Sequence, residues 1–286
     1  MESLTNISVV KDILNRHGFN FSKGLGQNFL INPTVCPKIA ELGNAKSGYG
    51  ILEIGTGFGV LTCELAKRCD KVVAVEIDSR LIPILQETLA EFDNVKIIND
   101  DIMKVDLDTI IKQEFEGLKV SVCANLPYYI TSPIIMMLLE SRLPIDSITV
   151  MVQKEAGQRL CAKVGTRETG AITVAVNYYG TVTKLFDVNR GSFMPSPNVD
   201  SCVIRIDIDH TPKLSKTEEE YFFKVVKASF SQRRKTITNT VSSCMGIPKV
   251  DIVKALESVG LSSNIRAEAI TMQQFIDFAM ALKSIE

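Results

Sequence analysis

Short apolar segments alternate with stretches of helical periodicity along much of the chain, and this alternation limits the folds that the chain can adopt. Helical patterns between successive strand-like segments predict a parallel sheet joined by right-handed crossovers. The four clearest segments are residues 51–55, 72–76, 95–98 and 120–124. Three later runs, which would complete a seven-stranded mixed sheet, are residues 148–153, 171–179 and 202–208. We therefore expect an α/β, Rossmann-like domain.

The pattern changes after residue 208, where only helical signals follow. Thr217 and Glu220 have the spacing of a capping box, which predicts that a helix begins there. A chain of 286 residues has room for one large domain and a small one. The expected division is a Rossmann-like domain at 1–208, with a helical extension at 1–22, and a smaller all-helical domain at 209–286.

Composition limits the partners and the compartment. The net charge is only −1, so contact with a nucleic acid would need a local basic face. The seven cysteines form no C-x-x-C pair, which argues for thiols in a reducing compartment and against a disulfide framework or a metal site. No signal-peptide pattern and no apolar run of membrane-spanning length is present. We expect a cytoplasmic monomer without a membrane partner.

A glycine-rich turn, Glu53-Ile54-Gly55-Thr56-Gly57-Phe58-Gly59, follows the first predicted strand and precedes a helix. Glycines allow a tight turn and a close approach of a ligand to the backbone. The spacing is G-x-G-x-G rather than the G-x-G-x-x-G of dinucleotide folds, which disfavours NAD. A plain strand-to-helix turn is the alternative.

Acidic residues follow the next two predicted strands. Glu76 ends one strand, where a carboxylate can accept hydrogen bonds from the two hydroxyls of a ribose. Asp100 and Asp101 follow the other, where an acceptor could meet the amine of an adenine. Each could instead be a solvated carboxylate or part of a turn. Since strand ends share one edge of a sheet, the glycine turn and the acids predict a nucleoside crevice that suits S-adenosylmethionine better than NAD.

Asn125-Leu126-Pro127-Tyr128 follows the fourth predicted strand. It places a side-chain amide, a rigid backbone carbonyl and an aromatic face on adjacent residues, and these groups could hold an extruded base by its exocyclic amine. Asn and Pro are also ordinary turn residues, so the motif alone is compatible with a simple exit from the strand. Its position beside the predicted nucleoside crevice favours a catalytic role.

With these motifs the chain resembles the ribosomal RNA adenine N6,N6-dimethyltransferase family, most closely its bacterial small-subunit branch. The motifs run in the family's order over about residues 22–208, and similarity continues into residues 230–236. Thr56 stands where many relatives have proline, and Tyr129 stands where others often have asparagine. The matching segments are Leu25-Gly26-Gln27-Asn28-Phe29-Leu30, Leu52-Glu53-Ile54-Gly55-Thr56-Gly57, Val75-Glu76-Ile77-Asp78, Asn99-Asp100-Asp101, Asn125-Leu126-Pro127-Tyr128, Val152-Gln153-Lys154-Glu155 and Ser192-Phe193-Met194-Pro195-Ser196-Pro197.

The resemblance implies a methyltransferase domain that uses S-adenosylmethionine and no metal. It would dimethylate the N6 amines of two adjacent adenosines in the 3′-terminal hairpin loop of 16S rRNA, within the small (30S) ribosomal subunit or its precursor. Asn125 and the Pro127 carbonyl would accept the hydrogens of the amine, with Tyr128 below the base and Phe193 above it. The expected cofactor contacts are Asn28, Leu30, Gly55, Glu76, Asp101 and Asn125.

Two basic clusters are expected to contact RNA phosphates, although charged runs are often only solvated faces. One contains Lys154 and Arg159, around a predicted helix, and the other contains Arg233, Arg234 and Lys235 in the helical domain.

Other functions remain open on the sequence. A large-subunit (23S) rRNA methyltransferase of the macrolide-resistance type would share the catalytic motif, but residues 152–155 and 195–200 are typical of the small-subunit branch. An assembly factor whose methylation is secondary is compatible with an intact cofactor crevice. An NAD oxidoreductase is disfavoured by the glycine spacing and by the lack of an evident hydride-site histidine.

Overall fold

The computed structural model describes residues 4–22, 24 and 26–285, so Leu25 of the first family motif lies outside the described residues. The chain forms two compact units, which are described separately. The first consists of Met1–Gly157 and Val182–Ile208, and the second of Gln158–Thr181 and Asp209–Glu286. Residue 208 is thus a boundary, but residues 158–181 group with the second unit, whereas the sequence division places them in the first domain.

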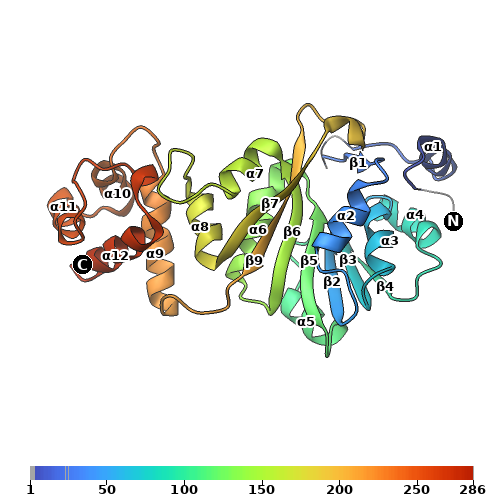
Figure 1. Cartoon of the computed structure of the whole chain (residues 1–286), viewed down its shortest axis with the longest axis horizontal. Coiled ribbons are helices and arrows are strands. Elements are labelled where there is room, and N and C mark those ends of the chain that lie inside the picture. Colours follow the sequence, from blue (N-terminus) through green and yellow to red (C-terminus); the bar gives the residue numbers. More distant parts are fainter. Residues whose placement is uncertain (1–3, 23, 25, 286) are drawn as a thin grey trace. The chain divides into compact units, whose positions relative to one another are not determined.

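A seven-stranded sheet organises the first unit, in the order β4-β3-β2-β5-β6-β9-β7 (Figure 1). β4, β3, β2, β5 and β6 are parallel to one another, and β9 is antiparallel to β6. This arrangement confirms the predicted mixed, Rossmann-like sheet. The strands are β2 (Tyr49–Ile54), β3 (Lys71–Glu76), β4 (Val95–Asn99), β5 (Lys119–Asn125), β6 (Ile145–Gln153), β7 (Gly180–Val188) and β9 (Ser201–Ile208).

One predicted strand is wrong, because residues 171–179 form helix α8 (Ala171–Tyr179) and the edge strand β7 follows it. A short, continuous apolar run does not distinguish a buried helix from a buried strand. The hydroxyls of Tyr178 and Tyr179 both donate to Glu219, at 3.0 and 3.1 Å, whereas adjacent side chains of a strand point to opposite faces. The sequence of β7 lacks a continuous apolar run because most residues of this edge strand are half-buried or exposed.

Helices cover the sheet and bury its apolar residues. Side chains of α2 and α3 pack with Ile51, Val72 and Ala74 in one core cluster on one face of the sheet. On the other face the Phe115 ring fills the space beside Gly50, where any side chain would collide with it. The helices are α1 (Ile7–Arg16), α2 (Val35–Leu42), α3 (Val60–Ala66), α4 (Ile82–Thr88), α5 (Leu107–Glu114), α6 (Thr131–Glu140) and α7 (Lys154–Leu160).

Aromatic side chains attach the amino-terminal segment to the glycine turn. The Phe29 ring stacks on Phe58 with 3.9 Å between ring centroids, and Phe19 meets both rings edge-on. Each such pair contributes about 0.5–1.5 kcal/mol beyond its burial. Short strands β1 (Phe29–Leu30) and β8 (Phe193–Met194) pair beside them. Residues 26–30 are thereby held next to the ends of the central strands.

The second unit is helical, as its sequence predicts after residue 208. Ser215 and Glu218 form the capping box of α9, since the Ser215 amide donates to Glu218 at 2.9 Å. The predicted box at Thr217 and Glu220 is wrong by two residues, because Thr217 already lies in the first turn of the helix. Tyr178 of α8 stacks on Phe222 of α9. With α8, the helices are α9 (Lys216–Ser229), α10 (Ile237–Met245), α11 (Lys249–Ser258) and α12 (Met272–Lys283).

Candidate active site

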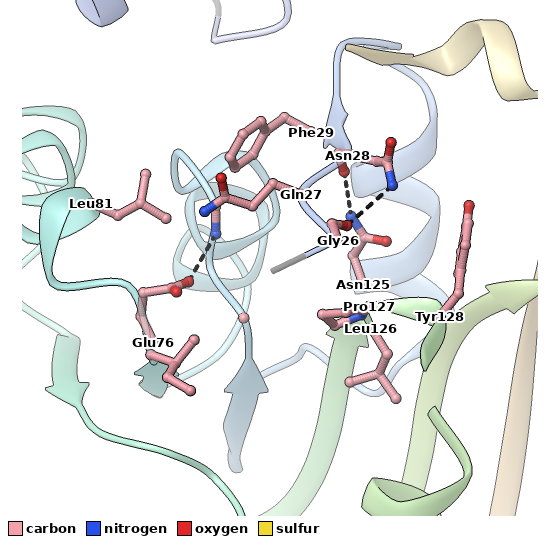
Figure 2. A pocket seen from close by; sticks show the side chains of 13 residues that line it. Gly26, Gln27, Asn28, Phe29, Glu76, Leu81, Asn125, Leu126, Pro127 and Tyr128 are labelled. Carbon is pink, nitrogen blue, oxygen red and sulfur yellow. Dashed lines mark hydrogen bonds between the residues drawn. The ribbon is translucent and has the colours of Figure 1, made fainter. Parts of the chain in front are cut away.

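A cavity lies at the carboxyl ends of β2, β3 and β5, the edge where open α/β sheets bind ligands (Figure 2). We call it the cofactor cavity. It brings together most of the motifs singled out in the sequence. The described residues that line it are Gly26, Gln27, Asn28, Phe29, Gly55, Gly57, Glu76, Ile77, Leu81, Asn125, Leu126, Pro127 and Tyr128.

The glycine turn forms one wall, and two of its positions require glycine. Gly55 has φ +75, and a Cβ there would meet only the Asn125 carbonyl oxygen, at 4.0 Å, so it would occupy the space between the two strand ends. Gly57 has φ +55, and a Cβ there would lie 2.7 Å from the Phe29 ring. The turn thus leaves backbone, without side chains, facing the cavity. This cradle fits a nucleoside cofactor.

Glu76 ties the glycine turn to the end of β3. Its Oε2 accepts hydrogen bonds from the Thr56 amide (2.9 Å), the Thr56 hydroxyl (3.0 Å) and the Gly57 amide (3.3 Å), and its Oε1 accepts one from the Asp78 amide (2.8 Å). Burial raises the pKa of Glu76, against the opposing effect of these bonds. Three of the four bonds are to Oε2, which leaves Oε1 with room for a further donor.

Asn125 ends β5 with its amide in a defined orientation. Its Nδ2 donates to the Asn28 carbonyl at 3.3 Å, and Asn28 in turn donates from its Nδ2 to the Gly26 carbonyl at 3.1 Å (Figure 2). Only the NH₂ group can donate to a carbonyl, so this contact fixes Oδ1 as the other end of the amide. That oxygen accepts no hydrogen bond from any described residue and remains available as an acceptor.

The backbone carbonyls of the motif differ from the prediction. The Pro127 carbonyl already accepts two hydrogen bonds, from the Ile130 amide and the Thr131 hydroxyl, both at 3.2 Å, because the chain turns into a short 3₁₀ helix at Tyr128–Ile130. The Leu126 carbonyl accepts none from the residues that the structure describes. The free carbonyl beside Asn125 is therefore that of Leu126, whereas the sequence analysis expected the Pro127 carbonyl to be the acceptor.

Tyr128 stands at the border of a second cavity. It lines the cofactor cavity and, together with Asn28, also lines a cavity bounded by Gln153 and residues 196–199. Its hydroxyl lies 2.7 Å from the hydroxyl of Ser201, which is fully buried at the start of β9. Burial raises the pKa of Tyr128. The hydrogen bond fixes the plane of an aromatic ring that two cavities share.

Three predicted site residues lie elsewhere. Leu30 lines a smaller cavity behind Gly55 rather than the cofactor cavity, and Phe193 is 3% exposed and packs in the sheet core. Asp101 accepts a hydrogen bond from the Met103 amide at 3.0 Å and lies 3.8 Å from Lys104. Neither Phe193 nor Asp101 is among the residues that line the cofactor cavity or the second cavity.

Sequence reasoning missed a polar clasp between Gln27, which lines the cofactor cavity, and Asp78. Gln27 Nε2 donates to Asp78 at 2.7 Å, and its Oε1 accepts from the Ser22 amide at 2.8 Å. Asp78 also pairs with Arg80, whose guanidinium lies 5.0 Å from the centre of the Phe19 ring. These bonds lower the pKa of Asp78, with the Arg80 contact the largest cause. The two family motifs that carry Gln27 and Asp78 were the available signal, but sequence does not show that they touch.

The residues predicted to contact RNA lie in two separate segments of the chain. Lys154 and Arg159 both belong to α7, which crosses the boundary between the units after Gly157, and Lys154 lies 3.6 Å from Asp187. Arg233, Arg234 and Lys235 are exposed in the turn between α9 and α10.

The described residues form neither a metal-ligand cluster nor a membrane-spanning helix. They contain no group of three or more His, Cys, Asp or Glu side chains that could hold a metal ion. None of the helices they form is long and apolar enough to cross a membrane.

The sheet order, the glycine turn and the acid at the end of β3 define a Rossmann-like methyltransferase fold. The chain belongs to the ribosomal RNA adenine dimethylase family, which it matches over residues 18–283. Over 286 residues it is 46% identical to the ribosomal RNA small subunit methyltransferase A of Bacillus mycoides (strain KBAB4) and to that of Bacillus cereus (strain B4264); each match covers 99% of this chain and 98% of the relative.

Two solved structures of methyltransferases are also similar to this chain. A dimethyladenosine transferase from Plasmodium falciparum is similar with a TM-score of 0.75 and 26% identity, covering 90% of this chain and 98% of that one. A 23S rRNA methyltransferase, ErmE, is similar with a TM-score of 0.69 and 25% identity, covering 90% of this chain and all of that one (100%). The predicted family, fold class and enzyme class are confirmed.

Proposed function

We propose that this protein transfers methyl groups from S-adenosylmethionine to the N6 amines of two adjacent adenosines near the 3′ end of small-subunit ribosomal RNA. The observation that carries the proposal is the pair of free acceptors at the end of β5. Asn125 Oδ1 and the Leu126 carbonyl stand side by side in sequence at the cofactor cavity, and no described residue donates to either.

The cofactor cavity fits S-adenosylmethionine, which supplies an electrophilic methyl group when bound. Gly55 and Asn28 would contact it through the open backbone of the cradle, and Glu76 Oε1 would accept a ribose hydroxyl. Ile77 is 53% exposed and offers an apolar surface for a base at the same cavity. Contacts by Leu30 and by Asp101 stay predictions.

Two acceptors are what adenine N6 chemistry needs. The N6 lone pair is delocalised into the ring, so the amine is a weak nucleophile while its hydrogens lie in the ring plane. Asn125 Oδ1 and the Leu126 carbonyl would each accept one hydrogen, direct the lone pair out of the plane, and stabilise the positive charge that develops on nitrogen. No base is required before transfer, because the methylated amine releases its proton readily.

The base must leave its stack to reach these acceptors, which costs a few kcal/mol. Stacking on Tyr128 would recover about 1–3 kcal/mol of this. The hydrogen bond to Ser201 supports the role because it holds the ring in one orientation. Stacking on Phe193 would require its side chain to leave the core.

Substrate RNA would be held by phosphate contacts. The exposed turn that carries Arg233, Arg234 and Lys235 is our proposed RNA-binding surface of the second unit, and Lys154 and Arg159 are proposed to add contacts. The small subunit is favoured over the large one because identity is 46% over 99% of this chain to small-subunit methyltransferases and 25% over 90% of this chain to ErmE. A role in subunit assembly is compatible with this activity.

Asn125→Ala tests the catalytic role. We expect roughly a 100- to 1000-fold fall in kcat for methyl transfer to unmethylated small subunits, the usual cost of removing one preorganised polar group that stabilises developing charge. Asn264→Ala, a change at an exposed asparagine of the second unit, is the matched control and should transfer normally. Near-normal transfer by a folded Asn125→Ala variant would refute the role.

A further inference from the structure

The second cavity contains a side-chain amide to which no role has yet been assigned. Its described lining is Asn28, Tyr128, Gln153, Ser196, Pro197, Asn198 and Val199. It shares Asn28 and Tyr128 with the cofactor cavity. A base stacked on Tyr128 with its amine at Asn125 would therefore have this cavity beside it.

Gln153 is placed next to Tyr128 by strand register. It is the last residue of β6 and pairs with Ser201 of β9. Directly opposed side chains on antiparallel strands lie on the same face of a sheet. The Ser201 hydroxyl reaches Tyr128 at 2.7 Å, so the Gln153 amide emerges on the face that carries the Tyr128 ring.

The same register relates Gln153 to the catalytic motif. Asn125 pairs with Met151, which lies two residues before Gln153 on β6. Alternate residues of a strand share a face, so Gln153 and Asn125 project on the same side of the sheet. The Gln153 side chain is half-buried, and its amide forms no hydrogen bond with any described residue.

The facing loop is fixed in place by Arg190. Its guanidinium donates to the Asn198 carbonyl at 3.3 Å, its amide donates to Asp200 at 3.0 Å, and its carbonyl accepts from the Ser196 hydroxyl at 2.9 Å. Asn198 also brings an amide to the cavity, but it is exposed on this loop, whereas Gln153 is part of the sheet. Gln153 is therefore the better-positioned amide.

The chemistry of adenine calls for a donor at this position. When both N6 hydrogens are accepted by Asn125 and the Leu126 carbonyl, the polar atoms left on the base are ring nitrogens, which only accept. Side-chain amides are the usual protein partners of adenine edges. We propose, on the basis of the function proposed above, that Gln153 Nε2 donates to N1 or N7 of the target adenine, the two ring nitrogens nearest the N6 amine, and that the second cavity is the recognition subsite for this base.

Two substitutions separate the donor from the shape of the side chain. Gln153→Glu keeps the shape but loses the NH₂ donor, and Gln153→Ala loses both. We expect each to lower kcat/KM for unmethylated small subunits by roughly tenfold to a hundredfold. Binding of S-adenosylhomocysteine, measured by calorimetry, should stay within twofold of wild type. Gln113→Ala makes the same change at an exposed glutamine of α5, outside both cavities, and should keep kcat/KM within threefold.

Small subunits reconstituted with 1-deazaadenosine or 7-deazaadenosine at the methylated position identify the acceptor. The ratio of wild-type to Gln153→Ala rates should fall to about one on the analogue that lacks the contacted nitrogen, and persist on the other. A Gln153→Glu variant with wild-type kcat/KM, or an unchanged ratio on both analogues, would overturn the proposal and leave the proposed function standing. Absence of adenine methylation by wild-type protein would overturn both.

Discussion

Glu53 is a buried carboxyl whose ionisation should control the stability of the first unit. It is fully buried on β2, and its oxygens have no hydrogen bond of good geometry to the described residues. Burial raises its pKa from 4.5 to about 8, the nearby Thr62 hydroxyl opposes the rise, and the charge of Glu76 adds to it. We therefore expect Glu53 to hold its proton near neutral pH.

The sign and size of the effect follow from proton linkage. The folded protein binds this proton more tightly than the unfolded chain, so the stabilisation is fully present below pH 4.5 and is lost as pH rises through about 8. At about 1.36 kcal/mol per tenfold difference in proton affinity, the whole loss is about 5 kcal/mol. Glu53→Gln cannot ionise, and the cost of its unpaired amide, about 1–3 kcal/mol, does not change with pH.

Urea unfolding followed by circular dichroism measures the effect. Between about pH 5 and about pH 9, the free energy of unfolding of Glu53→Gln should rise relative to wild type by about 4 kcal/mol, because about 1 kcal/mol of the whole loss has already occurred at pH 5. Glu116→Gln makes the same change of charge at an exposed site and serves as the control. Parallel pH dependences for wild type and Glu53→Gln would refute the reasoning.

Three further predictions follow from the site and the proposed RNA surface. Ser201→Ala and Tyr128→Phe should each lower kcat/KM for RNA about twofold to tenfold. Because both substitutions remove the same hydrogen bond, the double variant should be no worse than either single variant, and additive losses would contradict this. Gly57→Ala should lower the free energy of unfolding by about 1–3 kcal/mol and weaken S-adenosylhomocysteine binding in calorimetry, since φ is +55 and an aromatic ring lies 2.7 Å from the added Cβ. Unchanged binding would count against the proposed cofactor cradle. Replacing Arg233 and Arg234 with alanine should reduce the slope of log affinity for small subunits against log salt concentration by about 2. An unchanged slope would show that neither arginine contacts an RNA phosphate.

Local sequence patterns predict most of the fold. The central strands are continuous apolar runs, and the glycine turn, Glu76 and Asn125 follow them directly, so their meeting at one sheet edge could be predicted. The strand predicted at residues 171–179 is wrong, because an apolar run of that length suits a buried helix as well as a strand.

The errors at the site concern backbone direction and long-range contact. The choice between the Pro127 and Leu126 carbonyls depends on which donors of the following turn bond to each oxygen. The Ile130 amide and the Thr131 hydroxyl both donate to the Pro127 oxygen. The Gln27 and Asp78 clasp joins residues 51 positions apart, which no local pattern reveals.

The most direct test of the proposed function is to locate the transferred methyl groups. Wild-type protein and labelled S-adenosylmethionine are incubated with unmethylated small and large ribosomal subunits, and the labelled nucleosides are identified after digestion. We predict N6,N6-dimethyladenosine in the small-subunit RNA alone, at two adjacent positions near its 3′ end. Label only in the large subunit, or on a base other than adenine, would contradict the account.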